Sequence, residues 1–205
     1  EELREKSHLA PKASQYLEVL NAETRRLTGI LDNFMKFARP GAIRLHQVDV
    51  KSVMAHIVSL LQYEAEEQHI RLETTLADDL PCVLGDETQI SQVLVNIVVN
   101  AFHAMSDGGV CRITAAGRTV AGRDWAEISV RDTGVGIKRD ELPRLFEPFY
   151  TTKASGSGLG LAIAYRIIQD HGGTIEVVSA AGSGTTVIVK LPATSIERQA
   201  DVVGT

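Results

Sequence analysis

Apolar positions near the start of the chain predict one long helix that needs partner helices. Between residues 12 and 38 they recur at steps of three and four, which is the heptad spacing of packed helices. The seam consists of Leu17, Leu20, Thr24, Leu27, Leu31, Phe34 and Ala38. Arg39-Pro40-Gly41 ends this helix, because proline removes a helical hydrogen bond and its ring clashes with the preceding turn. We therefore expect an arm that dimerises with a second copy of the chain.

The remainder of the chain alternates between strand and helix patterns. Residues 70–76, for example, alternate apolar and polar positions as a half-buried strand does. Strands are predicted at 48–50, 70–76, 110–120, 125–132, 174–180 and 185–191, and helices at 51–68, 87–105 and 158–171. Asp86 with Gln89 forms a capping-box pattern at the start of the second of these helices. The strands come in pairs and the helices are few. The pattern therefore favours an α+β fold, a two-layer α/β sandwich with a mixed, mostly antiparallel sheet and helices on one face.

The same pattern suggests where the parts of the chain begin and end. Residues 1–40 are predicted to be a partial helical hairpin, mostly its second helix, and residues 41–47 a short linker. Residues 48–192 form the sandwich, and the tail 193–205 is expected to be loosely held. The abrupt helical start EELREK indicates a fragment whose parent protein can carry a membrane anchor elsewhere.

Composition narrows the classes of function. The chain has 205 residues and a net charge of −5, so bulk charge gives no reason to expect nucleic-acid binding. Cys82 and Cys111 lie far apart and form neither a metal-binding spacing nor a disulfide framework, which suits a reducing cytosol. The sequence contains no apolar run long enough to span a membrane and no signal-peptide pattern. We expect a cytoplasmic segment without membrane contact.

The helix predicted at 87–105 carries two asparagines within an apolar run. Its apolar stripe, which is expected to face the sheet, consists of Ile90, Val93, Leu94, Ile97, Val98, Ala101 and Met105. A second stripe holds Asn96 and Asn100, which are four residues apart and so share one helical face, with His103 further along. Such a pair borders either a core or a binding site, and this helix alone does not distinguish the two.

Two further stretches combine glycines with a feature that suits a ligand. In RDTGVG (131–136), Asp132 ends a strand, while Gly134 and Gly136 permit positive φ or close backbone approach. Taken alone, this motif is also compatible with an Asx turn. In GSGLGLAIAYRIIQDHGG (156–173), glycines run directly into a helix, whose N-terminal N–H groups and dipole suit phosphate. The stretch is neither a Walker loop nor a dinucleotide fingerprint, because it lacks GK[ST] and opens no βαβ unit.

Between these two stretches lies FEPFYTTK (146–153), in the loop predicted at 133–156. Phe146 and Phe149 are candidates to anchor this loop hydrophobically. Lys153 supplies a point charge that is suited to a phosphate. On its own, the segment is equally compatible with an ordinary loop and a solvated lysine.

Taken in order, these stretches resemble the ATP-binding domain of bacterial two-component sensor histidine kinases, in the superfamily shared with gyrase, HSP90 and MutL. The N, G1, F, G2 and G3 boxes of that family match the asparagine pair, DTGVG, FEPFYTTK, GSGLGL and GSGTT (182–186). The ending NFMKFARPG is similar to the family's second dimerisation helix, and FEPFYTTK resembles the nitrogen-regulation type. The resemblance covers nearly the whole chain. It implies that residues 48–192 bind ATP and Mg²⁺ and transfer the γ-phosphoryl group to a histidine.

The resemblance also implies roles for individual residues. Asp132 would accept a hydrogen bond from the adenine amino group, and a carboxylate selects adenine because it only accepts. Asn100 would give its carbonyl oxygen to Mg²⁺, and Asn96 would orient the magnesium shell or the γ-phosphate. With Lys153, which would hold the phosphates, these asparagines form the implied catalytic group. The implied ATP-contacting residues are Asn96, Asn100, His103, Asp132, Gly134, Gly136, Ile137, Thr151, Thr152, Lys153, Gly156, Ser157, Gly158, Leu159, Gly160, Leu161 and Thr185.

Asn96 also separates transfer from hydrolysis. In the ATP-hydrolysing cousins the matching residue is a glutamate that activates water, whereas an asparagine has no basic oxygen. The family's acceptor histidine lies on the first dimerisation helix, in a context that the residues around His8 do not match. The resemblance therefore implies an acceptor upstream of residue 1.

The implied partners are a second copy of the chain, paired through the N-terminal helices, and a response-regulator receiver domain that takes the phosphoryl group onto an aspartate. Two alternatives remain open at this stage. One is a nucleotide-binding pseudokinase that signals through dimer conformation, and the other is an ATPase of the same superfamily.

Overall fold

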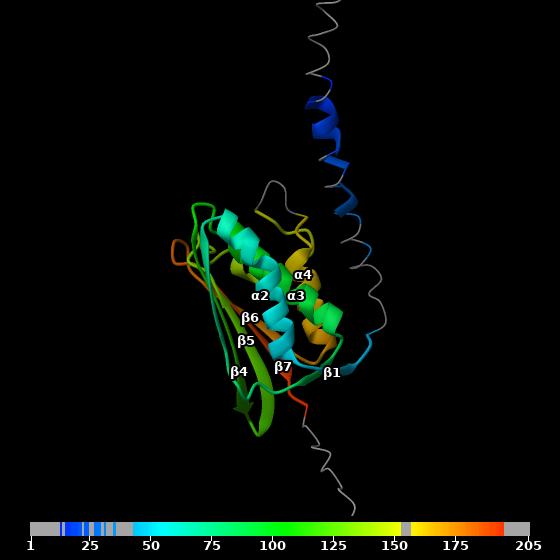
Figure 1. Ribbon diagram of the computed structural model, residues 1–205, viewed down its shortest axis with the longest axis vertical. Coiled ribbons are helices and arrows are strands. Elements are labelled where there is room, and N and C mark those ends of the chain that lie inside the picture. Colours follow the sequence, from blue (N-terminus) through cyan, green and yellow to red (C-terminus); the bar gives the residue numbers. More distant parts are fainter. Residues whose placement is uncertain are drawn as a thin grey trace, which may run out of the picture.

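The computed structural model describes residues 43–152 and 157–194, together with part of a helix in the N-terminal arm. In that arm the described positions are residues 13, 15–21, 23, 24, 27–29, 31 and 35, which are helical and exposed. The predicted helix is therefore confirmed where it is described, and it stands apart from the rest of the chain (Figure 1). The first hairpin arm with His8, the end of the helix at Arg39-Pro40-Gly41, and the tail beyond residue 194 lie outside the described residues.

The described part of the chain beyond residue 43 folds as strands and helices in the predicted order. The strands are β1 (His46–Val48), β2 (Ile70–Leu76), β3 (Val83–Gly85), β4 (Gly109–Val120), β5 (Arg123–Arg131), β6 (Thr174–Ser179) and β7 (Thr185–Pro192). The helices are α2 (Val50–Glu67), α3 (Glu87–His103), α4 (Gly160–Asp170) and a 3₁₀ turn, η1 (Leu142–Arg144).

Three details differ from the sequence prediction. The strand expected at 48–50 is displaced to His46–Val48, because Asp49 caps α2 and its Oδ1 accepts from the Lys51 N–H at 2.9 Å. Strand β3, which was not predicted, pairs antiparallel with β1 and ties the predicted linker to the sandwich. The predicted loop at 133–156 contains η1. Each missed element is only three residues long, too short for a periodic pattern to reveal.

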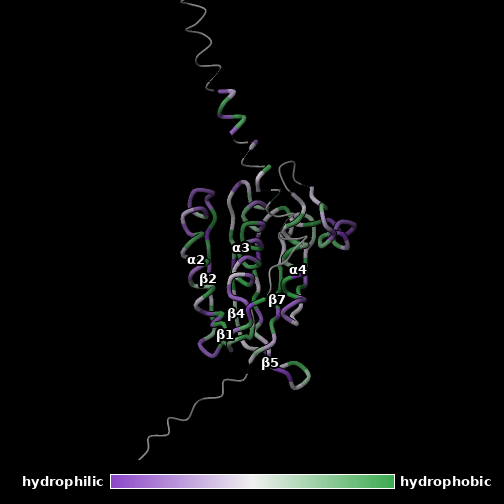
Figure 2. The backbone as a smooth tube through the Cα atoms, turned by 90° about the vertical axis from the view of Figure 1, so that its right-hand side faces the viewer, coloured by the Kyte–Doolittle hydropathy of each residue, from purple (hydrophilic) through white to green (hydrophobic). Residues whose placement is uncertain are grey.

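The main sheet has five strands in the order β2-β4-β5-β7-β6. Strands β2 and β4 are parallel, and the other neighbouring pairs are antiparallel. The β4–β5 hairpin closes through Ala121 and Gly122, both at positive φ, as a two-residue turn requires. Helices α2, α3 and α4 lie together on one side of the sheet (Figures 1 and 2). The predicted two-layer sandwich with a mixed, mostly antiparallel sheet is confirmed.

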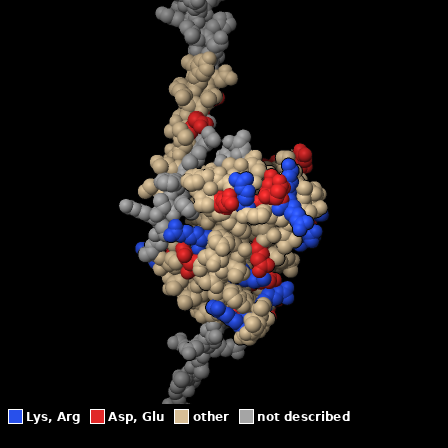
Figure 3. Space-filling view, turned by 180° about the vertical axis from the view of Figure 1, so that it is seen from behind, with Lys and Arg blue, Asp and Glu red and all other residues tan. Residues whose placement is uncertain are grey.

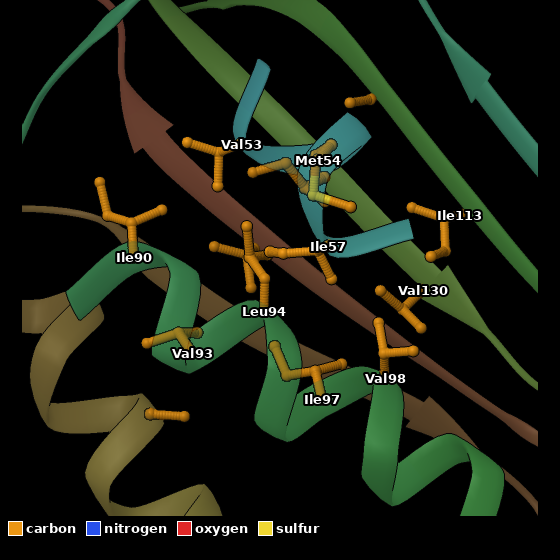
Figure 4. Packing of buried hydrophobic residues seen from close by; sticks show 14 of the residues in the cluster. Val53, Met54, Ile57, Ile90, Val93, Leu94, Ile97, Val98, Ile113 and Val130 are labelled. Carbon is orange, nitrogen blue, oxygen red and sulfur yellow. The ribbon is translucent and has the colours of Figure 1, made fainter. Parts of the chain in front are cut away.

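The core lies between the helices and the sheet. In Figure 4, Val53, Met54 and Ile57 of α2 lie next to the apolar stripe of α3. Ile113 and Val130 of the sheet belong to the same cluster. All seven predicted members of the α3 stripe are at most 5% exposed. Phe102 is also fully buried, which the predicted stripe omitted. Burial of this face, at about 25 cal/mol per Å² of apolar surface, fixes how α3 is rotated about its axis.

The capping pattern at the start of α3 is half confirmed. Asp86 is the N-cap, and its Oδ1 accepts from the Gln89 N–H at 3.1 Å. The Asp86 N–H, however, donates to Nε2 of His171 at 3.0 Å rather than to a glutamine side chain. Nδ1 of His171 lies 2.7 Å from the Ile167 carbonyl, so this ring joins the end of α4 to the start of α3.

On the face in Figure 3, acidic and basic side chains are interspersed rather than gathered by sign. Cross-strand ion pairs such as Arg112 with Glu73 (2.8 Å) and Lys190 with Glu176 (3.0 Å) join neighbouring strands of the main sheet. Among the residues that the structure describes, no helix is both long and apolar enough to cross a membrane.

Candidate functional site

Side-chain alternation brings three polar residues to the helix-covered face of the sheet. The buried residues that define this face are Ala126, Ile128 and Val130 in β5, and Val189 and Leu191 in β7. Asp132 and Thr185 continue these alternating series, and Ser179 of β6 is the register partner of Thr185. Because α3 and α4 cover the same face, these side chains point towards the helical layer.

Asp132 is a buried carboxyl group, with only 4% of the residue exposed. Its Oδ1 accepts from the Gly134 N–H at 2.8 Å and from the Thr185 N–H at 3.1 Å. Burial raises the pKa of Asp132, because desolvation penalises the charged form, while backbone N–H donors partly oppose that rise. Within the described part of the chain no hydrogen bond reaches Oδ2, so this oxygen is available to a ligand that donates.

The loop after Asp132 is held from two sides. The Val135 N–H donates to the Ala104 carbonyl at the end of α3 (3.0 Å), and the Val135 carbonyl accepts from Gly182 in the β6–β7 turn (2.7 Å). At Gly136, φ is +67°, and a Cβ atom there would overlap the Ala180 carbonyl oxygen. The prediction that this glycine permits close approach at positive φ is confirmed. The loop is thus a fixed bridge between the helical layer and the sheet edge.

Gly134 is needed because a side chain would not fit there, and not because of its backbone conformation. No positive φ is recorded there, but a Cβ atom would overlap the Ala104 carbonyl oxygen. Ile137, the last predicted contact in this loop, is half-buried and donates its N–H to Oγ of Ser179 at 2.9 Å.

Ser179 belongs to the site, although the sequence analysis did not single it out. It lies at the end of β6 and contacts the loop after Asp132, Thr185 and the carbonyl of Gly184. In the sequence it is one polar position in an alternating strand, and many solvent-facing strand positions have that character. Its role depends on a register between β6 and β7 that the sequence does not display.

The polar edge of α3 lies where it was predicted. Asn96 and Asn100 are half-buried beside the core stripe, and His103 is exposed in the last turn. Nδ2 of Asn96 lies 3.5 Å from the Gly160 carbonyl, so this edge faces the start of α4. The sequence of helix 87–105 left open whether its asparagine pair borders the core or a binding site. That question depends on which elements lie beside the pair, and these are a helix N-terminus and a glycine loop.

The N-terminus of α4 has no side-chain cap among the described residues. Leu159 is its N-cap and is fully buried, which anchors the helix start in the core. Before it, Gly158 has a φ of +66° and lies against the backbone of Phe149, where a Cβ atom would overlap. The Leu159 N–H lies 3.4 Å from Oγ of Ser157, and Leu161 is half-buried. Uncapped N–H groups at a helix start suit an anion.

Of the two phenylalanines predicted to anchor the intervening loop, only one does so. Phe146 packs against the core, and its ring centroid lies 5.0 Å from that of Tyr165 on α4. Phe149 is 59% exposed at a φ of +67°, so its backbone rather than its ring makes the contact with Gly158. The anchoring prediction for the Phe149 side chain is wrong, because the chain turns there to meet the glycine.

Four further predicted contacts lie around the gap in the described chain. Thr151 and Thr152 are exposed just before it. Lys153 and Gly156 lie outside the described residues. Among the described residues, Asn96 contacts the start of α4, and the loop after Asp132 contacts both the end of α3 and the β6–β7 turn.

Comparison with known families gives a direct match. Residues 85–195 match the family described as "Histidine kinase-, DNA gyrase B-, and HSP90-like ATPase". The matched segment begins just before α3 and ends beyond β7, so it contains every described residue of the candidate site.

Individual relatives extend the similarity further. The sensor histidine kinase ZraS of Escherichia coli (strain K12) is 36% identical over 188 residues, which cover 92% of this chain and 40% of ZraS. Among solved structures, full-length ShkA in complex with AMPPNP has a TM-score of 0.76 and 28% identity, over 88% of this chain and 39% of that one. The histidine kinase ThkA in complex with the response regulator TrrA has a TM-score of 0.72 and 26% identity, over 87% of this chain and 51% of ThkA. The chain thus spans about two fifths of the length of ZraS.

Proposed function

The chain belongs to the family of histidine kinase-, DNA gyrase B- and HSP90-like ATPases, and we propose that it is the ATP-binding catalytic region of a sensor histidine kinase. It binds Mg-ATP, and the γ-phosphoryl group passes to a histidine for relay to an aspartate of a response regulator. The observation that carries the proposal is the buried Asp132. Gly134 and Thr185 hold one of its oxygens and leave the other to a donor.

The adenine end of the site is built around that free oxygen. The 6-amino group of adenine donates two hydrogen bonds, and the Oδ2 atom of an ionised Asp132 accepts one. Guanine carries a carbonyl oxygen at this position. That oxygen and the carboxylate are both hydrogen-bond acceptors, so they would face each other without a hydrogen bond. Because Asp132 is buried, the mismatch would not be relieved by water and would cost about 1 to 3 kcal/mol. The site therefore favours adenine.

The phosphate end lies between α3 and the start of α4. The uncapped N–H groups at Gly160 and Leu161 suit phosphate oxygens, and Lys153 adds a positive charge from the preceding loop. Asn100 would offer its amide oxygen to Mg²⁺, which takes few protein ligands when phosphates supply others. ATP itself supplies the group that is transferred.

Asn96 sets the choice between transfer and hydrolysis. It faces the Gly160 carbonyl at the phosphate end, where an ATPase needs a general base to activate water. An amide cannot take that proton, whereas a histidine imidazole brings its own nucleophilic lone pair. Transfer forms a P–N bond to the imidazole and breaks the bond from the γ-phosphorus to the bridging oxygen, so ADP leaves.

The partners follow from the same proposal. The acceptor histidine lies on a dimerisation helix, and the exposed apolar residues of the N-terminal helix pair with a second copy. These residues include Tyr16, Leu17, Leu20, Leu27 and Leu31, each at least 57% exposed. A response-regulator receiver domain then takes the phosphoryl group, as the similarity to ThkA in complex with TrrA supports. Dependence on ATP makes the cytoplasm the location of this activity.

Calorimetry with the chain as it stands tests nucleotide and magnesium binding together. We expect ATP to bind in the presence of Mg²⁺ and to bind more weakly with EDTA. Asn100→Ala should remove the magnesium dependence, whereas Asn21→Ala, an exposed asparagine of the N-terminal helix, should leave it intact. No ATP binding by the wild-type chain would refute the proposed function.

Phosphoryl transfer is tested in trans. The chain is incubated with γ-labelled ATP and a longer protein that carries both dimerisation helices and a catalytic domain inactivated at the position matching Asn100. A label on that protein that is lost in acid and kept in base identifies phosphohistidine. Release of inorganic phosphate without such a label would instead support an ATPase.

A further inference from the structure

Ser179 makes three hydrogen bonds through a single hydroxyl group. Its Oγ lies 2.8 Å from the Gly184 carbonyl oxygen, 2.9 Å from the Ile137 backbone nitrogen and 2.9 Å from Oγ1 of Thr185. The three partners come from the loop after Asp132, the β6–β7 turn and the start of β7. Ser179 therefore connects the elements that surround Asp132.

The directions of these bonds follow from counting protons. A serine hydroxyl has one hydrogen to donate and can accept two bonds. The Gly184 carbonyl can only accept, so it takes the Ser179 hydrogen, and the Ile137 N–H can only donate, so it occupies one lone pair. The remaining lone pair faces Thr185, whose hydroxyl hydrogen must therefore point to Ser179.

This arrangement fixes the polarity of Thr185. Because its hydrogen is engaged by Ser179, the threonine oxygen can only accept a further hydrogen bond. Thr185 is 8% exposed, and its backbone N–H donates to Oδ1 of Asp132, so the hydroxyl lies beside the carboxyl group. The two side chains therefore present acceptors and no donor to a ligand at this end of the site.

We infer that Ser179 is a positioning residue that holds the Thr185 hydroxyl as a hydrogen-bond acceptor and so strengthens selection of a base with an amino group over one with a carbonyl group. The inference rests on the proposed binding of ATP and goes beyond it, because Ser179 acts through Thr185. Without Ser179 the Thr185 hydroxyl can rotate and donate to a carbonyl oxygen. Part of the discrimination is then lost even though Asp132 is unchanged.

The matched pair of probes is ATP and inosine triphosphate, in whose base a carbonyl replaces the 6-amino group and the adjacent N1 carries a hydrogen. Affinities for both are measured with Ser179→Ala, Thr185→Val and the double variant, with Ser183→Ala as the control from the same turn. Ser183 is exposed, and its backbone N–H donates to the Ala180 carbonyl, so truncating its side chain leaves this network intact. We expect the ATP-to-inosine preference to fall about fivefold or more in Ser179→Ala. It should fall similarly in Thr185→Val and no further in the double variant.

The outcomes separate this inference from the proposed function. Equal loss of affinity for both nucleotides in Ser179→Ala would mean a merely structural role and would overturn the inference, as would additive effects in the double variant. If Ser179→Ala does not fold, Thr185→Val decides, because an unchanged preference there overturns the inference on its own. Failure of the wild-type chain to bind ATP would overturn the proposed function, and this inference with it.

Discussion

Oδ1 of Asp132 accepts a hydrogen bond from the backbone N–H of Thr185 at 3.1 Å, across 53 positions of sequence. The Gly134 N–H donates to the same oxygen at 2.8 Å. These two bonds thus converge on one oxygen of the carboxyl group. One carboxyl oxygen of Asp132 thus binds the surrounding backbone, and the other is available to a ligand. A substitution can therefore change the ligand contact and keep the backbone contacts.

Asp132→Asn should separate them. The asparagine Oδ1 can accept both N–H bonds, so the fold should persist, but Nδ2 would replace the free acceptor with a donor that faces the adenine amino group. We expect ATP affinity to fall at least tenfold while the melting temperature stays the same or rises, since a buried charge is removed. Calorimetry and thermal unfolding measure the two effects. Asp140→Asn, an exposed match, should change neither, and unchanged ATP affinity in Asp132→Asn would refute the adenine contact.

The raised pKa of Asp132 predicts a pH dependence of stability. Because the folded protein holds the proton more tightly than the unfolded chain does, this group's contribution is fully present below the unfolded pKa. It is lost as pH rises through the folded pKa. The free energy of unfolding of Asp132→Asn should therefore increase relative to wild type as the pH rises above the ordinary aspartate pKa of about 3.9. Urea unfolding at a series of pH values measures this difference. A difference that stays constant or runs the other way would contradict the burial argument.

Gly136→Ala should disrupt the loop after Asp132. The added Cβ would meet both a positive φ and the Ala180 carbonyl oxygen, so we expect a loss of about 2 kcal/mol or more, together with weaker ATP binding. Gly122→Ala in the β4–β5 turn is the control, with a φ of +75° and nothing within 4 Å of the added atom. It should cost about 1 to 2 kcal/mol from strain alone and leave ATP affinity unchanged. Equal effects of the two variants on ATP affinity would show that the close contact is unimportant.

His171→Ala should destabilise the junction of α3 and α4. It would leave the Asp86 N–H without its partner and remove the ring contact with Ile167, at a cost of about 1 to 3 kcal/mol. Chemical denaturation measures the loss, and His56→Ala on the exposed face of α2 serves as the control. If both variants are equally stable, the buried ring does not hold the junction.

Most of the fold could be predicted from periodicity. The bounds of β2 match the prediction, and α2 and α3 differ from it by at most two residues at either end, because long stretches repeat their pattern over several turns or pleats. Strand β3 was missed because three residues carry no period, and its pairings with β1 and with Ala193 join segments far apart in the sequence. Strand β1 was predicted two residues too late, because an aspartate such as Asp49 can be either a strand residue or a helix cap.

The candidate site residues from Asn96 to Thr185 were named partly from local patterns, such as an amide on a helix face or a glycine before a helix, and partly from the family resemblance. Their roles stay predictions. Ser179 could not be named, and the Phe149 ring was placed wrongly, because both depend on which distant backbone lies nearby.

The sequence by itself determined the longer elements, the order of the motifs and the buried stripe of α3, because these follow from short-range periodicity and residue chemistry. Only the tertiary structure decided that Asp132, Thr185 and Ser179 share one hydrogen-bond network, which includes the direction in which the Thr185 hydroxyl points. The physical reason is that strand pairing sets the register of residues far apart in sequence. A hydroxyl group can accept or donate until its neighbours settle the choice.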